Sequence, residues 1–373
     1  MRIALNILYL IPGEVGGTET YARELISHLP KKKGDTYYIY CSRESANLFT
    51  ESDNFRVIVL PFSAHSRPLR MLFEQLILPF YLLAHSIDVV FSLGYSSPWL
   101  SPARSVVTIH DLNWHYHPED FTPFSRLIWE LTTRLSARSS THIITDSEAS
   151  ADSITKVLRI KLDKVTPILH AAPKKVLLSP AEVRNRLKRL GINGKYISTV
   201  VAGYPHKNLI TLLRAFRKVS HKSPDLSLIV CGLGGKADHM AKNYIQKNKL
   251  GKKISILGYV TREDLVAVYM GSSLFVFPSA YEGFGYPPIE AMQYGVPVIS
   301  SDAHSLSEVV GDGGALVEPY DVAGMASSIA EILNSPNKQS ELRKSGKNRL
   351  AKLSWEKTLS STMQILTRVG ARS

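Results

Sequence analysis

The sequence predicts an α/β protein built from two doubly wound parallel-sheet domains. Short β-branched runs alternate with amphipathic segments along the chain, which is typical of parallel sheets with helices on both faces. The alternation restarts after a stretch rich in Pro and Lys at residues 171–180. The length of 373 residues suits two domains of about 100–200 residues each.

In the first half, β-branched and aromatic runs predict strands, and longer amphipathic or apolar segments predict helices. Strands are expected at Ile3–Tyr9, Tyr37–Cys41, Val57–Leu60, Asp88–Phe91, Val106–His110, His142–Thr145 and Val165–Leu169. Helices are expected at Thr18–His28, Arg70–His85, Ser125–Arg138 and Ser147–Leu158.

The second half repeats this architecture without a visible sequence repeat. Strands are expected at Ile197–Ala202, Leu226–Cys231, Ile254–Leu257, Leu274–Phe277, Pro297–Ile299 and Ala315–Val317. Helices are expected at Leu209–Ser220, Ala237–Asn248, Arg262–Met270, Pro288–Tyr294, Ala323–Leu333 and Ser340–Lys352. In folds of this kind, ligands bind at the carboxyl ends of the strands, here in a cleft between the domains.

These elements predict four parts of the chain. A first parallel-sheet domain covers residues 1–172, a linker with a first helix covers 173–194, and a second parallel-sheet domain covers 195–353. In residues 354–373, a helix from Trp355 to Val369 has no later strand to feed. We therefore expect it to cross back and pack on the first domain.

The composition excludes several classes of protein. Apolar residues make up 44% and charged residues 21%, which disordered, collagen-like and disulfide-scaffold proteins do not show. The two cysteines, Cys41 and Cys231, lack metal-ligand spacing and suit a reducing compartment.

The longest apolar stretch, Leu76–Ala84, is far shorter than the roughly 20 residues of a membrane span. The apolar N-terminus lacks a cleavage site of small residues. We expect a cytoplasmic protein.

The positive charge is concentrated in one region. The formal net charge is +13, and residues 156–253 carry 22 basic and 4 acidic side chains. A phosphate-rich partner, an anionic membrane surface and a solvated lysine-rich face all remain open. No basic motif interleaved with aromatic residues accompanies the charge, so nucleic acid is not expected as a partner.

The most informative segment runs from Phe275 to Ser300. A buried strand should end at Pro278, and a helix should open near Pro287 and Pro288, where missing N–H groups cost nothing. A Glu-Gly-Phe-Gly loop at residues 282–285 lies between them. Its glycines allow close approach of the backbone, and free N–H groups at the helix entry favour an anion or hydroxyl groups.

Two carboxylates belong to this segment. We expect Glu282 on the rim of the loop and Glu290 on the first turn of the helix, where one can reach a sugar and the other a ribose. Two solvated glutamates in an ordinary strand–turn–helix are the alternative.

The segment resembles the Glu-x7-Glu signature of retaining glycosyltransferase family 4, which has the GT-B fold. The resemblance extends over about residues 2–335 and includes further segments in chain order. These are Gly16-Gly17, Thr108–Asp111, Ser301–Val310 and Asp312–Val317.

The resemblance implies that residues 1–172 form the N-terminal, acceptor-side domain and that residues 195–353 form the nucleotide-sugar-binding domain. It also implies roles in donor binding. Glu290 would bind the donor ribose, and Glu282 would face the transferred sugar, together with Gly283 and the amides of Phe284 and Gly285. Lys207 would clamp the diphosphate, where negative charge develops in the transition state.

One position departs from the family pattern. The arginine that usually follows the strand-ending glycine is absent, because Gly203 is followed by Tyr204, Pro205 and His206. His206 or another basic residue would have to replace it.

Other matching positions have implied roles as well. The backbone at Tyr259 and Val260 would hold the base, and Gly16 and Gly17 would approach the donor phosphate. His110 would contact the donor sugar, in a positioning role; a satisfied core histidine is the alternative.

No metal or cofactor is expected. The GT-A type Asp-x-Asp motif is absent, and the cluster of Asp111, His115 and His117 lies on a loop without a matching fourth zinc ligand.

The family implies transfer of a hexose with retention, by front-face attack in which the departing phosphate oxygen helps to take the acceptor proton. GDP-mannose is the favoured donor, because residues 204–208 and 282–285 resemble mannosyltransferase members; UDP-glucose and UDP-N-acetylglucosamine remain open. The acceptor would be a glycan or polyprenyl-linked oligosaccharide in surface polysaccharide (O-antigen, lipopolysaccharide) synthesis. A silent nucleotide-sugar or glycan-binding protein, or an epimerase or phosphorylase of the same fold, are the alternatives.

Two segments bear on a membrane. The stretch Pro68–Ala84 is apolar around most of its circumference. It could be a helix buried against the sheet, or a surface for a lipid-linked acceptor or an anionic membrane. Lys31–Lys33 could add attraction to that membrane or form a solvated turn. Peripheral contact with the inner face of the cytoplasmic membrane therefore remains one of the open interpretations.

Overall fold

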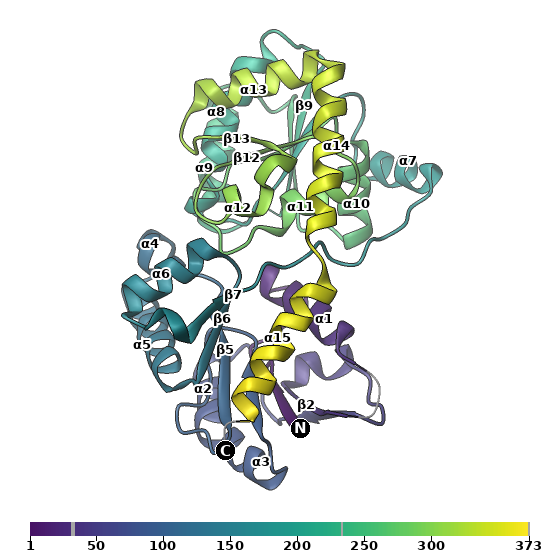
Figure 1. Cartoon of the computed structure of the whole chain (residues 1–373). Helices are drawn as coiled ribbons and strands as arrows, with labels where there is room; N and C mark the ends of the chain where they lie inside the picture. Colours follow the sequence, from purple (N-terminus) through teal and green to yellow (C-terminus); the bar gives the residue numbers. More distant parts are fainter. Residues whose placement is uncertain (31–33, 233, 372–373) are drawn as a thin grey trace. The chain divides into compact units, whose positions relative to one another are not determined.

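A computed structural model of the chain describes residues 1–30, 34–232 and 234–371 (Figure 1). The expected lysine turn at Lys31–Lys33 lies outside the described residues. The chain divides into two compact units. Unit 1 consists of Met1–His170 and Trp355–Ser373, and unit 2 consists of Ala171–Ser354.

Unit 1 contains a parallel sheet of seven strands in the order β3-β2-β1-β4-β5-β6-β7. The strand order reverses between β1 and β4, as in doubly wound sheets. The strands are β1 (Arg2–Asn6), β2 (Thr36–Cys41), β3 (Phe55–Val59), β4 (Val89–Ser92), β5 (Arg104–Thr108), β6 (His142–Thr145) and β7 (Val165–Pro167).

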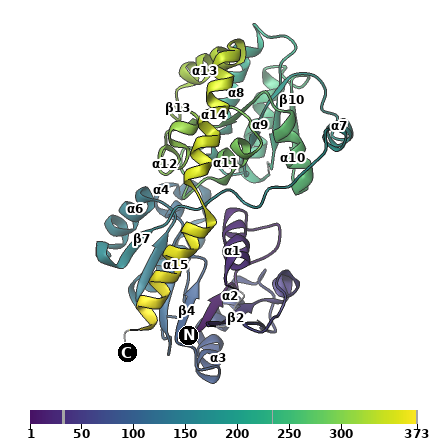
Figure 2. The same cartoon turned by 45° about the vertical axis from the view of Figure 1, so that its right-hand side comes forward.

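Helices cover this sheet. They are α1 (Gly17–His28), α2 (Arg67–Leu72), the π-helical η2 (Phe73–Ile77), α3 (Leu78–Ala84), α4 (Asn113–Tyr116), α5 (Pro123–Ser139), α6 (Glu148–Leu158) and α15 (Trp355–Gly370), with 3-10 turns η1 (Arg43–Leu48), η3 (Pro118–Asp120) and η4 (Leu162–Lys164). The last helix, α15, packs beside α1 and against strands β4, β5 and β6 (Figure 2). The Thr358 hydroxyl donates a hydrogen bond to the carbonyl of Leu169.

Two elements of unit 1 differ from the sequence prediction. The first strand ends at Asn6 and not at Tyr9, because the Asn6 side chain turns the backbone by accepting a hydrogen bond from the Leu8 N–H. The single helix expected at Arg70–His85 is interrupted by the π-helical turn at Phe73–Ile77. Pro79 follows this turn and lacks an N–H donor, so regular α-helical bonding cannot continue through it.

Unit 2 contains a parallel sheet of six strands in the order β10-β9-β8-β11-β12-β13. The strands are β8 (Tyr196–Val200), β9 (Ser227–Cys231), β10 (Ile254–Gly258), β11 (Leu274–Phe277), β12 (Val298–Ser301) and β13 (Ala315–Val317). The helices are α7 (Pro180–Arg189), α8 (Leu209–Ser220), α9 (Gly235–Lys247), α10 (Arg262–Gly271), α11 (Tyr286–Gln293), α12 (Leu306–Val310), α13 (Val322–Asn334) and α14 (Pro336–Lys352), with 3-10 turns η5 (Pro205–Lys207) and η6 (Gly311–Gly313).

The core of unit 2 follows from the predicted pattern. Leu212 and Phe216 of α8 and Ile329 of α13 are buried against Ile197 and Val276 of the sheet. The short helix α12 was not predicted, because five residues are too few to show a helical period. In the described part of the chain, no helix has the length and apolar character needed to cross a membrane.

The predicted fold class is confirmed: both sheets are parallel and carry helices, as in the GT-B fold. In a parallel sheet, the carboxyl ends of all strands lie along one edge. Functional side chains on the loops that follow the strands can therefore come together at that edge.

Candidate active site

Three segments of unit 2 meet at the carboxyl edge of its sheet. They follow β8, β11 and β12, and they contain residues 201–208, 278–285 and 302–306. Hydrogen bonds join them directly. The N–H of Ala280 donates to the carbonyl of His206 at 2.8 Å, and the Ser301 hydroxyl donates a short bond to the carbonyl of Ser279.

The carbonyl of Glu282 is held from two sides. His304 Nδ1 lies 2.6 Å and Ser305 Oγ lies 2.7 Å from this oxygen. A carbonyl can only accept, so both side chains donate and the Nδ1 of His304 carries a proton. Their segment follows β12, so the loop after β11 is positioned by a neighbouring strand end.

Gly285 completes the loop and begins α11. Its φ of 89° lies in the left-handed region that favours glycine. A Cβ at this position would lie 2.6 Å from a methyl carbon of Leu306. The glycine that sequence reasoning singled out is therefore required by both backbone conformation and space.

Lys207 and Glu282 form an ion pair across two of the segments. The Nζ–Oε1 distance is 2.7 Å, and both side chains are largely buried. Asn208 anchors the lysine segment: its Nδ2 donates to the carbonyls of Pro278 and Pro319 at 3.0 and 2.6 Å. The sequence predicted both charged residues for this site, but not that they would contact each other.

Glu290 lies on the second turn of α11, because the helix begins at Tyr286 and contains two prolines in its first turn. The prediction of a first-turn position was therefore wrong by one turn. The Tyr269 hydroxyl donates to Glu290 Oε2 at 3.0 Å. Burial raises the pKa of Glu290, although the Tyr269 hydrogen bond and the charge of Arg262 act in the opposite direction. Further hydrogen-bond donors would therefore stabilise the ionised form of Glu290.

Sequence reasoning missed the residues that support the carboxylates. Tyr269 and Arg262 lie on α10, and His304 and Ser305 lie beside α12. None belongs to a spaced motif, so only their contacts in the fold reveal them. Arg262 supplies a guanidinium near Glu290, and its Nη2 donates to the carbonyl of Lys174 at 2.8 Å.

The remaining predicted residues of unit 2 lie at the same edge. Gly203 follows β8, and His206 is buried with its ring stacked on Tyr204 at 5.8 Å between centroids. Tyr259 and Val260 follow β10, and the Tyr259 side chain is exposed. Their contacts with a nucleotide stay predictions.

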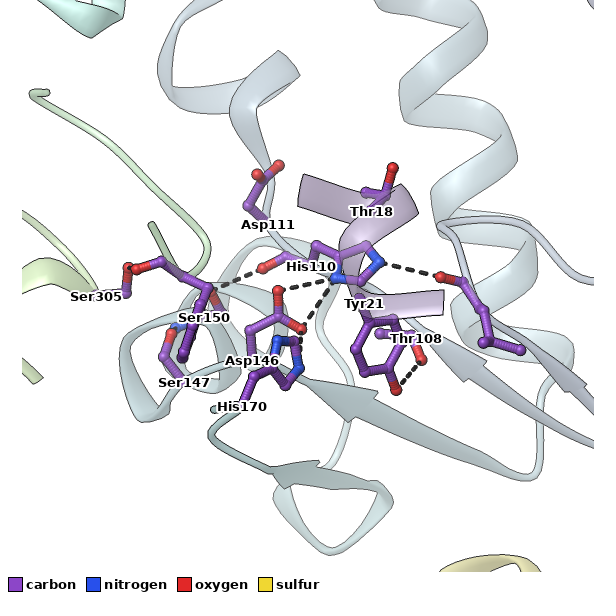
Figure 3. Close-up of polar contacts among 12 residues, drawn as sticks. Thr18, Tyr21, Thr108, His110, Asp111, Asp146, Ser147, Ser150, His170 and Ser305 are labelled. Atoms are coloured by element: carbon purple, nitrogen blue, oxygen red, sulfur yellow. Dashed lines mark hydrogen bonds and ion pairs between the residues drawn. The ribbon is translucent and has the colours of Figure 1, made fainter. Parts of the chain in front are cut away.

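His110 follows β5 of unit 1, in a buried polar cluster (Figure 3). Its Nδ1 lies 2.8 Å from Asp146 Oδ2, and its Nε2 lies 3.0 Å from the carbonyl of Leu93. Both partners can only accept, so the geometry requires a proton on each ring nitrogen, which is the charged imidazolium.

The neighbours of His110 complete this cluster. His170 Nε2 lies 3.3 Å from Asp146 Oδ1, and the Tyr21 ring stacks on His170 at 4.5 Å. The Tyr21 hydroxyl lies 3.3 Å from the hydroxyl of Thr108, in the strand that leads to His110. The arrangement fits the satisfied core histidine that the sequence left open as an alternative. A contact from His110 to a sugar stays a prediction.

The ion pair shifts both pKa values. Burial lowers the pKa of His110, but attraction and hydrogen bonding to Asp146 outweigh burial and raise it overall. Burial raises the pKa of Asp146, but its attraction to His110 and His170 holds the pKa well below the usual value. The two groups are therefore both charged near neutral pH.

Two other predicted features belong to unit 1. Gly16 has a φ of 62° and directly precedes Gly17, the first residue of α1, so the glycine there permits the turn into the helix. In the cluster of Asp111, His115 and His117, where zinc was not expected, His117 Nδ1 lies 2.9 Å from Glu119 Oε1. Among the residues that the structure describes, no group of three or more ligand side chains is arranged for a metal ion.

Comparisons with known proteins agree with this geometry. A "Glycosyltransferase Family 4" model matches residues 15–171, and a "Glycosyl transferases group 1" model matches residues 185–349. The O-antigen chain mannosyltransferase B of Escherichia coli is 32% identical over 270 residues, which cover 70% of this chain and 69% of the relative. The O-antigen chain mannosyltransferase RfbU of Salmonella typhimurium is 27% identical over 312 residues, covering 81% and 83%.

Solved structures share the fold. Sucrose-phosphate synthase from Thermosynechococcus elongatus superposes with a TM-score of 0.80 at 20% identity, over 100% of both chains. WaaG, a glycosyltransferase of lipopolysaccharide biosynthesis, gives 0.73 at 13% identity over 98% of this chain and all of WaaG.

The two sheets and the loop after β11 thus define a GT-B glycosyltransferase. The chain belongs to glycosyltransferase family 4 and is a hexosyltransferase of this retaining, metal-independent family. The resemblance inferred from Glu282, Glu290 and the surrounding glycines is confirmed.

Replacing Asp146 with Asn tests the buried ion pair. The His110 contribution to stability is complete below its unfolded pKa of about 6.5 and is lost as pH rises through the raised folded pKa. The Asp146 contribution is complete above about pH 3.9 and is lost as pH falls through the depressed folded pKa. We expect Asp146→Asn to lower the free energy of unfolding by about 3–5 kcal/mol between these limits.

Thermal unfolding across the pH range and NMR titration of the His110 ring measure this effect. Asp152→Asn is the matched control, because Asp152 forms only an exposed pair with Lys156. A destabilisation that does not vary with pH, together with an unchanged His110 titration, would contradict the charged pair.

Proposed function

We propose that the chain transfers mannose from GDP-mannose to a glycan or polyprenyl-linked acceptor during synthesis of a surface polysaccharide such as O-antigen. The relatives named as O-antigen mannosyltransferases support the sugar and the context. The observation that carries the chemistry is the Lys207–Glu282 pair at 2.7 Å, whose carboxylate lies in the loop that leads into the helix of Glu290. Cytoplasmic location at the inner face of the membrane belongs to the same proposal.

A nucleotide diphosphate sugar suits the charges of the site. The Anabaena protein Alr3699/HepE, whose fold is similar at a TM-score of 0.72, was solved with UDP. In this chain, Glu290 would accept hydrogen bonds from the donor ribose, and the backbone at Tyr259 and Val260 would hold the base. Gly16 and Gly17 would approach the donor phosphates from unit 1.

Lys207 would exchange its carboxylate partner for the diphosphate when the donor binds. A diphosphate carries more negative charge than a carboxylate, so it would compete with Glu282 for the ammonium group. Release from Lys207 would leave the Glu282 carboxylate to accept hydrogen bonds from the sugar, beside Gly283 and the amides of Phe284 and Gly285. The carbonyl bonds from His304 and Ser305 would keep the loop in place during this exchange.

The transfer step follows the retaining course of the family. The acceptor oxygen forms a bond to the anomeric carbon on the face from which the diphosphate departs, and the bond to the phosphate oxygen breaks. The departing oxygen takes the acceptor proton. Lys207 stabilises the negative charge that develops on the leaving group. His206, or another basic residue, would make up for the absent arginine.

A screen of nucleotide sugars tests the donor. We expect GDP-mannose and GDP to raise the melting temperature more than UDP-glucose or UDP-N-acetylglucosamine, and mannose transfer or slow hydrolysis to follow with GDP-mannose alone. A larger shift with a uridine nucleotide would exclude the proposed donor. Binding without any turnover would instead favour a silent nucleotide-sugar-binding protein.

Glu290→Ala should weaken donor binding by about 1–3 kcal/mol, because the hydrogen bonds to the ribose are lost. Wild-type affinity should also fall with decreasing pH from above the usual glutamate pKa of about 4.3, since burial raises the pKa of Glu290. Calorimetric titration with the nucleotide measures both effects. Glu341→Ala is the control, because it removes an exposed carboxylate paired with Lys338. Unchanged affinity in Glu290→Ala would refute the ribose assignment.

Lys207→Ala should mainly lower kcat, by roughly 2–4 kcal/mol in barrier, if the ammonium group stabilises the leaving diphosphate. Steady-state kinetics with varied donor and acceptor separate this from a binding defect. Lys207→Arg should recover part of the rate because the charge is kept. A change confined to the KM for the acceptor would assign Lys207 a different role.

A further inference from the structure

Helix α5 of unit 1 is oriented with its apolar residues outward. Its buried positions are small or polar: Thr132, Thr133, Ser136 and Ala137. Its exposed positions form a stripe at helical spacing, which we call the α5 stripe: Phe124, Leu127, Ile128 and Leu131. Phe124 is 74% and Leu127 is 61% exposed. An amphipathic helix of a water-soluble surface would normally present the opposite face.

The helical segment α2–α3 carries a second stripe of the same kind. Its exposed residues, here called the α3 stripe, are Leu69, Leu72, Leu76, Phe80 and Leu83. Phe80 is 69% and Leu83 is 61% exposed. Glu74, in contrast, is buried and accepts hydrogen bonds from Asn6 and Ser96. The sequence left open a helix buried against the sheet and an exposed apolar surface. The segment shows both, because Leu78 and Leu82 pack in the cluster with Ala4 and Val90 while the α3 stripe is exposed.

Both stripes lie on the same side of the sheet. Ala4, Val90, Val107 and Ile143 share one face, as the strand register shows. Leu78 and Leu82 of α3 pack in one cluster with Ala4 and Val90, and Ala137 of α5 packs with Val107 and Ile143. The opposite sides of these helices therefore point away from the same sheet face.

A short loop bridges the two helical segments. Gln75 of η2 donates to the carbonyl of Ser97 and accepts from the N–H of Trp99, while Ser136 of α5 accepts from the N–H of Ser97. Leu100 follows directly and is 87% exposed. The loop that hydrogen-bonds to both helical segments thus adds a further exposed apolar side chain.

A basic cavity lies at the C-terminal end of α5. It has a volume of about 590 Å³ and is lined by Arg138, Arg159, Lys161, Lys164 and Arg368, with Asp163 as a counter-charge. Arg138 lies two turns beyond Leu131 on the same face of α5. Leu162, between these lysines, is also exposed.

The cavity has a strongly positive electrostatic potential. Burial, followed by the charges of Arg368 and Lys164, lowers the pKa of His142 to about 4. Burial also lowers the pKa of Lys164. Because burial is the main cause of both shifts, the case for an anionic partner depends on the five basic side chains that line the cavity against one carboxylate.

We propose that the α5 stripe, the α3 stripe and the basic cavity together form a docking surface for a bilayer of anionic phospholipids. The apolar side chains would enter the boundary between headgroups and acyl chains, and the cavity would receive lipid phosphates. Leucine and phenylalanine beside arginine and lysine are the combination that interfacial binding requires, since apolar burial and charge attraction act together.

Charge argues against a second copy of the chain as the partner. In a symmetric dimer, the same surface meets itself. Both copies of the five cations of the cavity and of the arginines of α5 would then lie in one interface, with Glu130 and Asp163 as the nearby carboxylates. Repulsion would oppose the apolar gain, whereas an anionic bilayer complements both features.

This surface serves the proposed function by bringing the enzyme to a lipid-linked acceptor, and its purpose rests on that function. Binding to vesicles requires neither donor nor acceptor. A failure to bind lipid would therefore leave the nucleotide-sugar chemistry untouched, and a different donor would leave the docking surface untouched.

Vesicle flotation tests the proposal with the full chain. We expect binding to phosphatidylcholine vesicles that contain phosphatidylglycerol, little binding without it, and a decrease as salt concentration rises. The triple variant Phe124→Ser, Leu127→Ser, Leu131→Ser should bind at least about ten-fold more weakly. The double variant Arg138→Glu, Lys161→Glu should lose the preference for the anionic lipid.

Matched variants of unit 2 control for general effects. Leu177→Ser removes an exposed leucine, and Lys218→Glu with Lys222→Glu removes exposed lysines, so all three should bind vesicles like the wild type. Thermal unfolding checks that each variant folds. The proposal is overturned if the wild type ignores anionic vesicles, or if the α5 variant binds them normally. It is also overturned if the wild type is a dimer that the α5 variant converts to a monomer, since the surface would then pair two copies.

Discussion

Parallel strand pairing is the constraint on which the chemistry of this protein depends. It places the carboxyl ends of all strands of a sheet along one edge, so segments distant in sequence reach the same place. Lys207 follows β8, Glu282 follows β11, and Ser305 follows β12. Each segment is then held by backbone carbonyl bonds to the next, and the charged side chains project from a fixed frame.

Each unit contains a buried ion pair. Lys207 meets Glu282 at 2.7 Å, and His110 meets Asp146 at 2.8 Å. Removal of one partner from a buried pair leaves an uncompensated charge, which costs about 3–5 kcal/mol. The pairs differ in what they allow. Lys207 and Glu282 lie at a strand edge where a stronger anion can replace the carboxylate, whereas both nitrogens of His110 are enclosed by acceptors.

Unit 1 has an apolar core around its sheet, but one of its helices exposes apolar side chains. Its sheet is covered in the usual way, yet α5 buries Thr132 and Ser136 and exposes Leu127 and Leu131. Small buried residues let the helix lie close to the sheet, and the Ser136 hydroxyl accepts a hydrogen bond from the Ser97 N–H. The exposed leucines gain nothing from this packing. A contiguous apolar stripe of this kind is typical of an interaction surface, which is the physical reason for proposing a partner.

The amino-acid sequence by itself determined the two parallel sheets, most element boundaries within a few residues, and the family, because these depend on local periodicity and on motifs such as Glu282 to Glu290. Only the tertiary structure decided which groups meet. Tyr269 reaches Glu290, and Asp146 reaches His110 across 36 residues. It also decided that the apolar stripe of α5 faces outward. An apolar period defines one side of a helix, but which side meets the sheet depends on the residues packed against it.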